Sequence, residues 1–275
     1  MTEELSALHK TYAWDLISLP PGKRAIGSCW VYKIKIDSHG TALFIKSTSH
    51  GCIILSLYVH YMIITGDDDN GIIELKLKLV RHFEMKELGT LRYFVGIEVA
   101  HSPRGYLLSQ SKYIGTILKQ AHLSDTQTIA SSLELDVHYT SSDRVHLSDP
   151  TLYRTLVGSL VYLTIIRSDI AYAVHVVSQF VVSPTTVHWV GVLHILRYLR
   201  CTQFQSLLFP TSSSLELCAY SDVDWGGDST NQKSTTGFCF FFLEDSLISW
   251  KSKTQVVVSC SSTEVEYRAM TSTTP

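Results

Sequence analysis

The chain has 275 residues, enough for one large domain or two modest ones with a sizeable core. Hydrophobic residues make up 45% of the chain and charged residues 17%, which excludes a disordered protein. The formal net charge of −2 gives no basic footprint of the kind that nucleic-acid enzymes use to neutralise phosphates, although a local basic groove is compatible with it.

The cysteines and the apolar stretches narrow the class of protein further. The six cysteines lie far apart without a Cys-x-x-Cys pair, which disfavours metal knuckles and disulfide-rich folds and favours free thiols in a reducing compartment. The N-terminus lacks the order of a signal peptide, and Cys52–Val59 and Ile170–Val182 are too short or too broken to span a membrane. We therefore expect an intracellular protein, in the cytoplasm or nucleus, with no membrane partner.

The N-terminal part of the chain predicts strands and one helix. Trp30–Ile36 alternates like a half-buried strand. Gly51–Gly66 is rich in β-branched residues and predicts two strands joined at His60-Tyr61, although this dipeptide is poor chemistry for a tight hairpin. Gly71–Phe83 has helical spacing, and Tyr93–Val99 reads as one strand.

The middle of the chain changes from mixed to helical. A strand is predicted over Gly105–Leu108 and a helix from about Ser111 to Ala121. Ser124–Ser148 is polar and without periodicity, so it is the best linker candidate. Three helical stretches then follow, at Tyr153–Leu163, Ile170–Phe180 and His188–Leu199.

From Leu215 onward the pattern is one of short strands. They are predicted at Leu215–Tyr220, Gly237–Leu243 and Leu247–Trp250. A final helix begins near Thr263, where Thr263-x-x-Glu266 has the spacing of a capping box. The whole pattern predicts an α/β protein.

Short motifs along the chain occur in a fixed order. They include Leu19-Pro20-Pro21-Gly22-Lys23, Trp30-Val31-Tyr32-Lys33, Tyr93-Phe94-Val95-Gly96-Ile97-Glu98, Leu108-Ser109-Gln110-Ser111-Lys112-Tyr113, Asp169-Ile170-Ala171-Tyr172-Ala173-Val174, Ala219-Tyr220-Ser221-Asp222-Val223-Asp224-Trp225 and Ser261-Ser262-Thr263-Glu264-Val265-Glu266-Tyr267. Each motif alone is weak, but together they resemble the Pol polyprotein of copia-type retrotransposons, in which a reverse transcriptase precedes a ribonuclease H.

The resemblance implies four segments. They are a partial reverse transcriptase over residues 1–123, a linker over 124–148, a helical connection over 149–212 and a truncated ribonuclease-H-like domain over 213–275. The expected architecture is therefore a partial palm and connection region followed by the first part of a ribonuclease-H-like fold.

The polymerase motif departs from the family. The family's palm hairpin carries Tyr-Val-Asp-Asp, whose carboxylates hold Mg²⁺, whereas this chain has Tyr58-Val59-His60-Tyr61. An imidazole and a phenol are poor ligands for a hard cation. The family block between the Trp-Val-Tyr-Lys strand and this hairpin, which contains another metal-binding aspartate, also appears deleted. His60 and Tyr61 therefore mark a degenerate polymerase site.

The ribonuclease H motifs are incomplete as well. The resemblance implies that Asp222 and Glu266 are the first two acidic ligands, while the family's two further aspartates would lie beyond residue 275. Two carboxylates are too few to hold both metal ions of a two-metal site. We expect both residues to be inactive remnants, with no bound cofactor, although the intact family uses Mg²⁺.

Other candidate ligands have simpler interpretations. Asp67-Asp68-Asp69 is expected to be a solvated turn. His188 and His194 lie six residues apart on a helix and so do not share a face. The Lys112/Lys119 and Lys251/Lys253 pairs are expected to be ordinary solvated charges.

The expected function follows from the resemblance and the departures together. The family carries out RNA-directed DNA synthesis and hydrolyses the RNA strand of the hybrid. This chain is expected to do neither, and to bind RNA or DNA weakly or not at all. The alternative is a non-catalytic module that binds nucleic acid or another Pol component. A basic groove on the helical segment would favour that alternative, and a mixed-charge surface would count against it.

Overall fold

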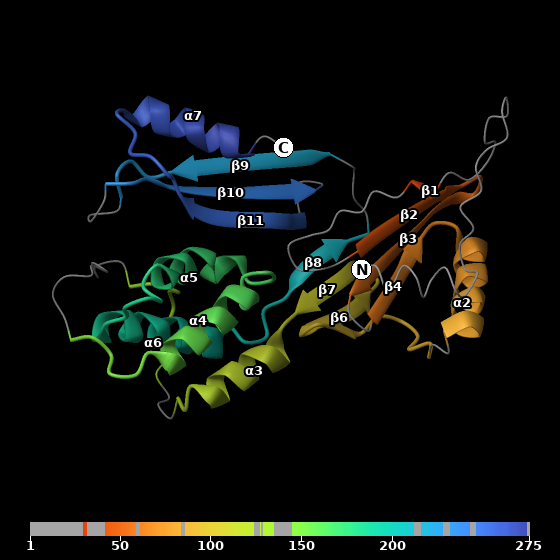
Figure 1. The fold of residues 1–275 in the computed structure, drawn as a ribbon, viewed down its shortest axis with the longest axis horizontal. Helices are drawn as coiled ribbons and strands as arrows, with labels where there is room; N and C mark the ends of the chain where they lie inside the picture. Colours follow the sequence, from red (N-terminus) through yellow and green to blue (C-terminus); the bar gives the residue numbers. More distant parts are fainter. Residues whose placement is uncertain are drawn as a thin grey trace. The chain divides into compact units, whose positions relative to one another are not determined.

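The computed structural model describes residues 30–31, 42–58, 61–83, 86–123, 127, 129–134, 145–211, 216–227, 232–242 and 246–273. The chain divides into two compact units, Met1–Leu91 and Arg92–Pro275 (Figure 1). No helix within these described ranges is long and apolar enough to cross a membrane.

The first unit contains an antiparallel sheet and one helix. In sheet order the strands are β1 (Trp30–Val31), β2 (Ala42–Thr48), β3 (Gly51–Tyr58) and β4 (Tyr61–Gly66), and helix α2 (Asp69–Phe83) follows and contacts β4. The helix predicted over Gly71–Phe83 is confirmed. Of the strand predicted over Trp30–Ile36, only Trp30 and Val31 lie within the described residues. The core is thin, because Ile53 is the one apolar side chain that is buried among the described residues of this unit.

A second antiparallel sheet begins the second unit. Its strands, in sheet order, are β5 (Tyr93–Phe94), β6 (Ile97–Ser102), β7 (Gly105–Ser109) and β8 (Leu207–Pro210). The strand β8 was not predicted, because four residues are too few to show a period. The pairing of β8 with β7 brings together residues about a hundred positions apart in sequence. The segment boundaries at 123, 148 and 212 stay predictions.

The single strand predicted over Tyr93–Val99 is wrong, because a two-residue turn interrupts it. Val95 and Gly96 have φ angles of +45° and +80° between the paired strands β5 and β6, as a type I′ turn requires. A valine rarely adopts positive φ, so the sequence gives no turn signal here. The hydroxyl of Tyr162 donates a hydrogen bond to the Val95 carbonyl and holds the turn against the helices.

Replacing Val95 with asparagine should raise the free energy of unfolding by about 1 kcal/mol. The left-handed backbone costs a non-glycine residue about 1–2 kcal/mol, and asparagine before glycine suits this turn best. Urea unfolding followed by circular dichroism measures the change. As a control, Gly96→Ala should destabilise, because its Cβ would lie 3.3 Å from the Tyr162 ring at a positive φ. A loss of stability in Val95→Asn as large as in Gly96→Ala would show that the turn is not strained.

The helices of the second unit enclose its main core. They are α3 (Ser111–Gln120), α4 (Thr151–Leu163), the short 3₁₀ helix η1 (Ser168–Ile170), α5 (Ala171–Ser178) and α6 (Thr186–Cys201). Figure 1 shows α4, α5 and α6 grouped together, and the four predicted helices are confirmed. Residues with the expected helical spacing fill the core, among them Leu156, Leu160, Ile195 and Leu199.

The two histidines of α6 lie in different environments, which agrees with the expectation that they do not share a face of the helix. His188 is fully buried, and its Nδ1 accepts a hydrogen bond from the Thr185 backbone in a capping box at the start of α6. His194 is exposed, and its Nε2 contacts the Ser131 carbonyl at 3.0 Å. Neither histidine is a candidate metal ligand.

The predicted linker lies along α6 where it is described. The Leu123 carbonyl accepts a hydrogen bond from Arg200, near the end of α6. The contact between Ser131 and His194 lies near its middle, and the Thr186 amide donates to the Val145 carbonyl at its start. The described parts of Ser124–Ser148 and their immediate flanks are therefore attached along α6 at these three points, besides other contacts to the helical segment.

The last part of the second unit is a three-stranded antiparallel sheet followed by a helix. The strands are β9 (Leu217–Val223), β10 (Thr235–Phe242) and β11 (Ser246–Thr254), in the sheet order β11-β10-β9, and the helix is α7 (Ser262–Thr273). The three predicted strands and the helix are confirmed. Val265 and Ala269 are buried where α7 packs against β9 and β10.

The capping box of α7 lies two residues earlier than predicted. The Glu264 amide donates to Ser261 Oγ, and the Glu264 carboxylate accepts from the Cys260 amide at 2.8 Å. Thr263 and Glu266 instead lie inside the helix. Ser261-x-x-Glu264 and Thr263-x-x-Glu266 have the same spacing, so the sequence alone cannot tell which of them begins the helix.

Candidate functional site

The hairpin to which the resemblance assigns the polymerase motif is formed by β3 and β4, but Tyr61, predicted at the junction of the strands, is the first residue of β4. Tyr58 at the end of β3 pairs directly with Tyr61 at the start of β4, so the connection consists of Val59 and His60. His60 lies outside the described residues. The side chain of Tyr61 is 51% exposed. Tyr61 therefore offers a solvent-facing phenol at the tip of the hairpin, where a metal site would need a carboxylate.

The acidic run after this hairpin bonds to its neighbours. The prediction of a solvated turn is wrong for Asp68, which is buried, whereas Asp67 is exposed. The Asp67 carboxylate accepts a hydrogen bond from the Cys52 amide at 2.5 Å, which lowers the pKa of Asp67. Asp68 is buried, and it accepts from the Thr48 hydroxyl at 2.6 Å and from the Gly71 amide at 2.9 Å, which lowers its pKa. Asp68 thereby caps α2. Asp67 thus bonds the end of β4 to β3, and Asp68 bonds the start of α2 to β2.

Within the described ranges, no three His, Cys, Asp or Glu side chains gather closely enough to hold a metal ion. A site for two-metal phosphoryl transfer would need several carboxylates close together.

The two candidate ribonuclease H residues lie on different elements. Asp222 is an exposed residue of β9, and its carboxylate accepts from the Val223 amide at 2.9 Å. Glu266 is an exposed residue of α7 and lines a shallow hollow beside Tyr267 and Met270.

The register of the sheet fixes the direction in which Asp222 projects. Asp222 lies directly opposite Gly237, and Gly237 lies opposite Ser252, so the three positions share one face. Thr254, two residues after Ser252, projects to that face as well. Its hydroxyl lies 3.0 Å from His175 Nε2 of α5. The Asp222 face is therefore the face that contacts α5.

Helix α7 covers the other face. Thr236 precedes Gly237 and so projects to the opposite side from Asp222. The Gln255 amide bridges from the Thr236 hydroxyl, at 3.0 Å, to the Val265 carbonyl of α7. Asp222 and the helix that carries Glu266 thus belong to opposite faces of the sheet. The assignment of both residues as remnants of a ribonuclease H site stays a prediction.

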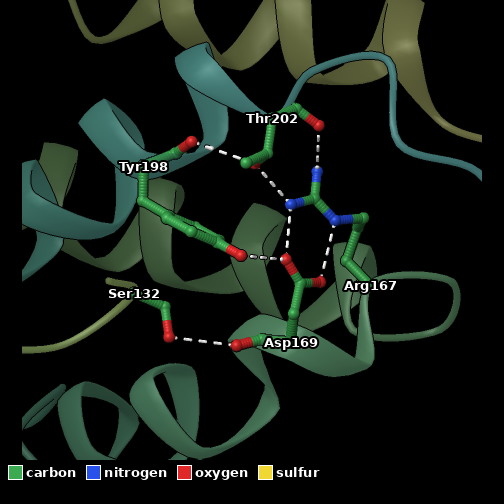
Figure 2. A network of polar contacts seen from close by, with 5 residues as sticks. All are labelled: Ser132, Arg167, Asp169, Tyr198 and Thr202. Atoms are coloured by element: carbon green, nitrogen blue, oxygen red, sulfur yellow. Dashed lines mark hydrogen bonds and ion pairs between the residues drawn. The ribbon is translucent and has the colours of Figure 1, made fainter. Parts of the chain in front are cut away.

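The most completely bonded polar cluster of the helical segment surrounds Arg167, whose side chain is 3% exposed (Figure 2). Its Nε and Nη2 donate to the two carboxylate oxygens of Asp169 at 2.8 and 2.6 Å. Nη1 and Nη2 also donate to the carbonyl and hydroxyl of Thr202 at 2.9 and 2.6 Å. The Tyr198 hydroxyl donates to Asp169 at 2.7 Å, and the Ser132 hydroxyl to its carbonyl at 3.0 Å.

The electrostatics of this cluster keep Asp169 ionised. Burial opposes the charge on Asp169, but the hydrogen bonds from Arg167 and Tyr198 outweigh it and hold the pKa of Asp169 below its usual value. Burial and the bond to Asp169 raise the pKa of Tyr198. The Arg167–Asp169 ion pair at η1 bonds to Tyr198 and Thr202 at the end of α6, so the cluster holds these two helices together.

Sequence patterns do not predict this cluster. Asp169 belongs to a motif that carried the resemblance, whereas Arg167, Tyr198 and Thr202 belong to none. The four-residue spacing of Tyr198 and Thr202 places them on one helix face. Only the packing of η1 against α6 brings Arg167 to them.

Comparison with protein families and known proteins gives consistent matches. The family model described as reverse transcriptase (RNA-dependent DNA polymerase) matches residues 37–134. No solved structure matches the chain.

The related proteins fall into two groups by length. The uncharacterized mitochondrial protein AtMg00810 of Arabidopsis thaliana is 40% identical over 216 residues, which are 78% of this chain and 89% of that protein. The Pol polyprotein from transposon RE2 of the same plant is 37% identical over 85% of this chain and 16% of the polyprotein. The Pol polyprotein from transposon TNT 1-94 of Nicotiana tabacum is 36% identical over 87% of this chain and 19% of the polyprotein. The matched region is thus a small part of each polyprotein.

Proposed function

Because the chain belongs to the family of copia-type retrotransposon Pol polyproteins, with a reverse-transcriptase region, we propose that it is a catalytically inactive member of that family. The observation that carries the proposal is the Tyr58–Tyr61 pair at the tip of the β3–β4 hairpin. The second aspartate of the family motif is replaced there by an exposed tyrosine, and the first by His60.

The surroundings of the hairpin support an inactive polymerase. Asp67 and Asp68 follow the end of β4 that is opposite to the hairpin tip, so they are not placed to replace the carboxylates of the motif. Their carboxylates instead bond to the Cys52 amide and cap α2. The sequence also lacks the family block that supplies another aspartate and the nucleotide pocket. Each missing 1.4 kcal/mol of transition-state stabilisation lowers the rate about tenfold, so losing several ligands leaves no measurable reaction.

We further propose that residues 213–275 correspond to the start of a ribonuclease-H-like domain without its activity. The order of three antiparallel strands and a helix supports the first half of this proposal. The placement of Asp222 on the sheet face opposite α7 supports the second half, because a two-metal site needs its carboxylates on one side.

The alternative of a nucleic-acid binding module is less well supported. Three arginines of the helical segment donate hydrogen bonds to other groups of the protein, although of these Arg167 is buried and Arg154 is exposed. Arg154 donates to the carbonyls of Val181 and Val182, Arg167 binds Asp169, and Arg200 donates to the Leu123 carbonyl. Phosphate contacts need such groups to face outward. With a net charge of −2, we expect at most weak non-specific binding, with a Kd of roughly 10⁻⁴–10⁻⁶ M.

Template-dependent DNA synthesis should be absent with Mg²⁺ or Mn²⁺, and it should remain absent after His60→Asp and Tyr61→Asp are combined. The double variant restores two carboxylates but not the deleted block. The measurement is incorporation of labelled nucleotides on RNA and DNA templates, with an intact copia-type reverse transcriptase as the positive control. Circular dichroism should show that the variant folds like the parent chain. Incorporation above background by either protein would contradict the proposal.

A further inference from the structure

Helix α2 carries an apolar stripe that faces solvent. None of its 15 residues is buried. Ile73, Leu77 and Val80 are 56%, 52% and 44% exposed, whereas Ile72, Leu75 and Leu79 on the neighbouring side of the helix are only half-exposed. The helix therefore has two apolar sides. The side with Ile72, Leu75 and Leu79 is partly buried, and the side with Ile73, Leu77 and Val80 is exposed to solvent. A monomer rarely exposes a continuous stripe of large apolar side chains without a binding role.

The spacing of the open stripe is that of a coiled-coil seam. Ile73, Leu77 and Val80 are separated by four and then three residues, which is the d-a-d spacing of a heptad. Glu74 and Arg81 each follow a d residue directly, so both occupy e positions on one border of the seam. Lys76 occupies the g position on the other border. This arrangement is suited to another helix.

We propose that a second copy of this chain docks on this stripe, with the two α2 helices antiparallel about a two-fold axis. In an antiparallel pair, the border with Glu74 and Arg81 meets the same border of the partner helix in the reverse direction. Each Glu74 then lies beside an Arg81 of the other copy, and the two-fold axis repeats the contact. In a parallel pair, Lys76 would instead lie beside Arg81 of the other copy, and the like charges would repel.

The charges on the stripe are available for this contact. Glu74 pairs with Lys78 within the helix at 2.6 Å, but both side chains are about two-thirds exposed, so the pair stabilises the helix only weakly. Lys78 keeps the pKa of Glu74 below its usual value, which preserves its negative charge. Lys76 is already paired with Glu87 at 2.7 Å. Glu74 can therefore exchange its weak partner Lys78 for Arg81 of a second copy, or bond to both, at little cost.

The short seam predicts a weak dimer. Three apolar layers on one helix bury much less than a stable dimer interface. The expected Kd is roughly 10–100 µM, the range of small transient interfaces. The association should therefore appear only at high protein concentration.

A charge-swap experiment on the full chain tests the proposal. Sedimentation equilibrium from about 1 to 300 µM brackets the expected Kd and measures the dimer directly. Glu74→Arg and Arg81→Glu should each raise the Kd about tenfold, because each places like charges across the axis twice. Combining them should return the Kd to within about threefold of the parent value, since the contact is rebuilt with its charges exchanged. Leu77→Glu should abolish the dimer.

Lys78→Glu is the matched control. It removes the same ion pair within α2 as Glu74→Arg does, but position 78 lies outside the seam. It should leave the Kd unchanged, and circular dichroism should show equal helix content in all variants. A parent chain that stays monomeric throughout, a dimer that survives Leu77→Glu, or a double swap that fails to restore association would each overturn the proposal.

Discussion

Replacing Arg167 with methionine should lower the free energy of unfolding by about 3–5 kcal/mol, the typical cost of removing one partner from a buried ion pair. The substitution leaves the partly buried Asp169 carboxylate without its guanidinium and removes two bonds to Thr202. Thermal unfolding should show the midpoint falling by roughly 10 °C, at about 2–4 °C per kcal/mol for a chain of this size.

Arg154→Met provides the control for this variant. Arg154 also donates to two backbone carbonyls, but it is exposed and leaves no buried charge behind, so its loss should cost about 1 kcal/mol. The pH dependence provides a second check. The folded-state pKa of Asp169 is lowered, so its contribution is present above the unfolded value of about 3.9 and disappears as the pH falls through the folded value. Equal losses in Arg154→Met and Arg167→Met would show that the ion pair is not the cause.

Replacing Gln110 with methionine should raise the free energy of unfolding by about 1–3 kcal/mol, the cost usually assigned to an unsatisfied buried polar group. Gln110 is 1% exposed, and neither its amide nitrogen nor its carbonyl oxygen has a hydrogen-bond partner among the residues that the structure describes. It precedes α3 on the side of the buried Ile114 and Ile117, where an apolar side chain of similar length fits. Chemical denaturation with a constant m-value would measure the gain.

Gln120→Met is the matched control, because Gln120 is an exposed residue at the other end of the same helix. Surface substitutions of this kind usually change stability by less than about 0.5 kcal/mol. If Gln110→Met destabilised the chain instead, Gln110 would have a partner in solution that satisfies its amide.

The parts of the fold that could be predicted from sequence are those with a clear period. The helices over Tyr153–Leu163 and His188–Leu199 were identified because their apolar residues recur every three or four positions, and those residues fill the core. The strands around Phe238 and Trp250 were identified from β-branched and aromatic content.

The features that could not be predicted depend on contacts between distant residues. Val95 adopts a positive φ in a turn that Tyr162, distant in sequence, holds by bonding to the Val95 carbonyl. Asp68 is buried because Thr48, twenty residues earlier, lies beside it across the sheet. For the candidate sites, the residues were identified by resemblance, but the face on which Asp222 lies depends on the pairing of β9 with β10. Sequence patterns carry none of this information.

The three attachments along α6 determine how much the chain between them can vary in length. The contacts at His194 and Thr186 are eight residues apart on the helix, or about 12 Å at the usual rise. The 14 residues from Ser131 to Val145 could reach about 45 Å if extended, so several could be lost without straining either contact. Additions are also tolerated, since doubling a loop costs only about 0.6 kcal/mol. Insertions and deletions should therefore accumulate between these two residues, while the attachment points keep their spacing.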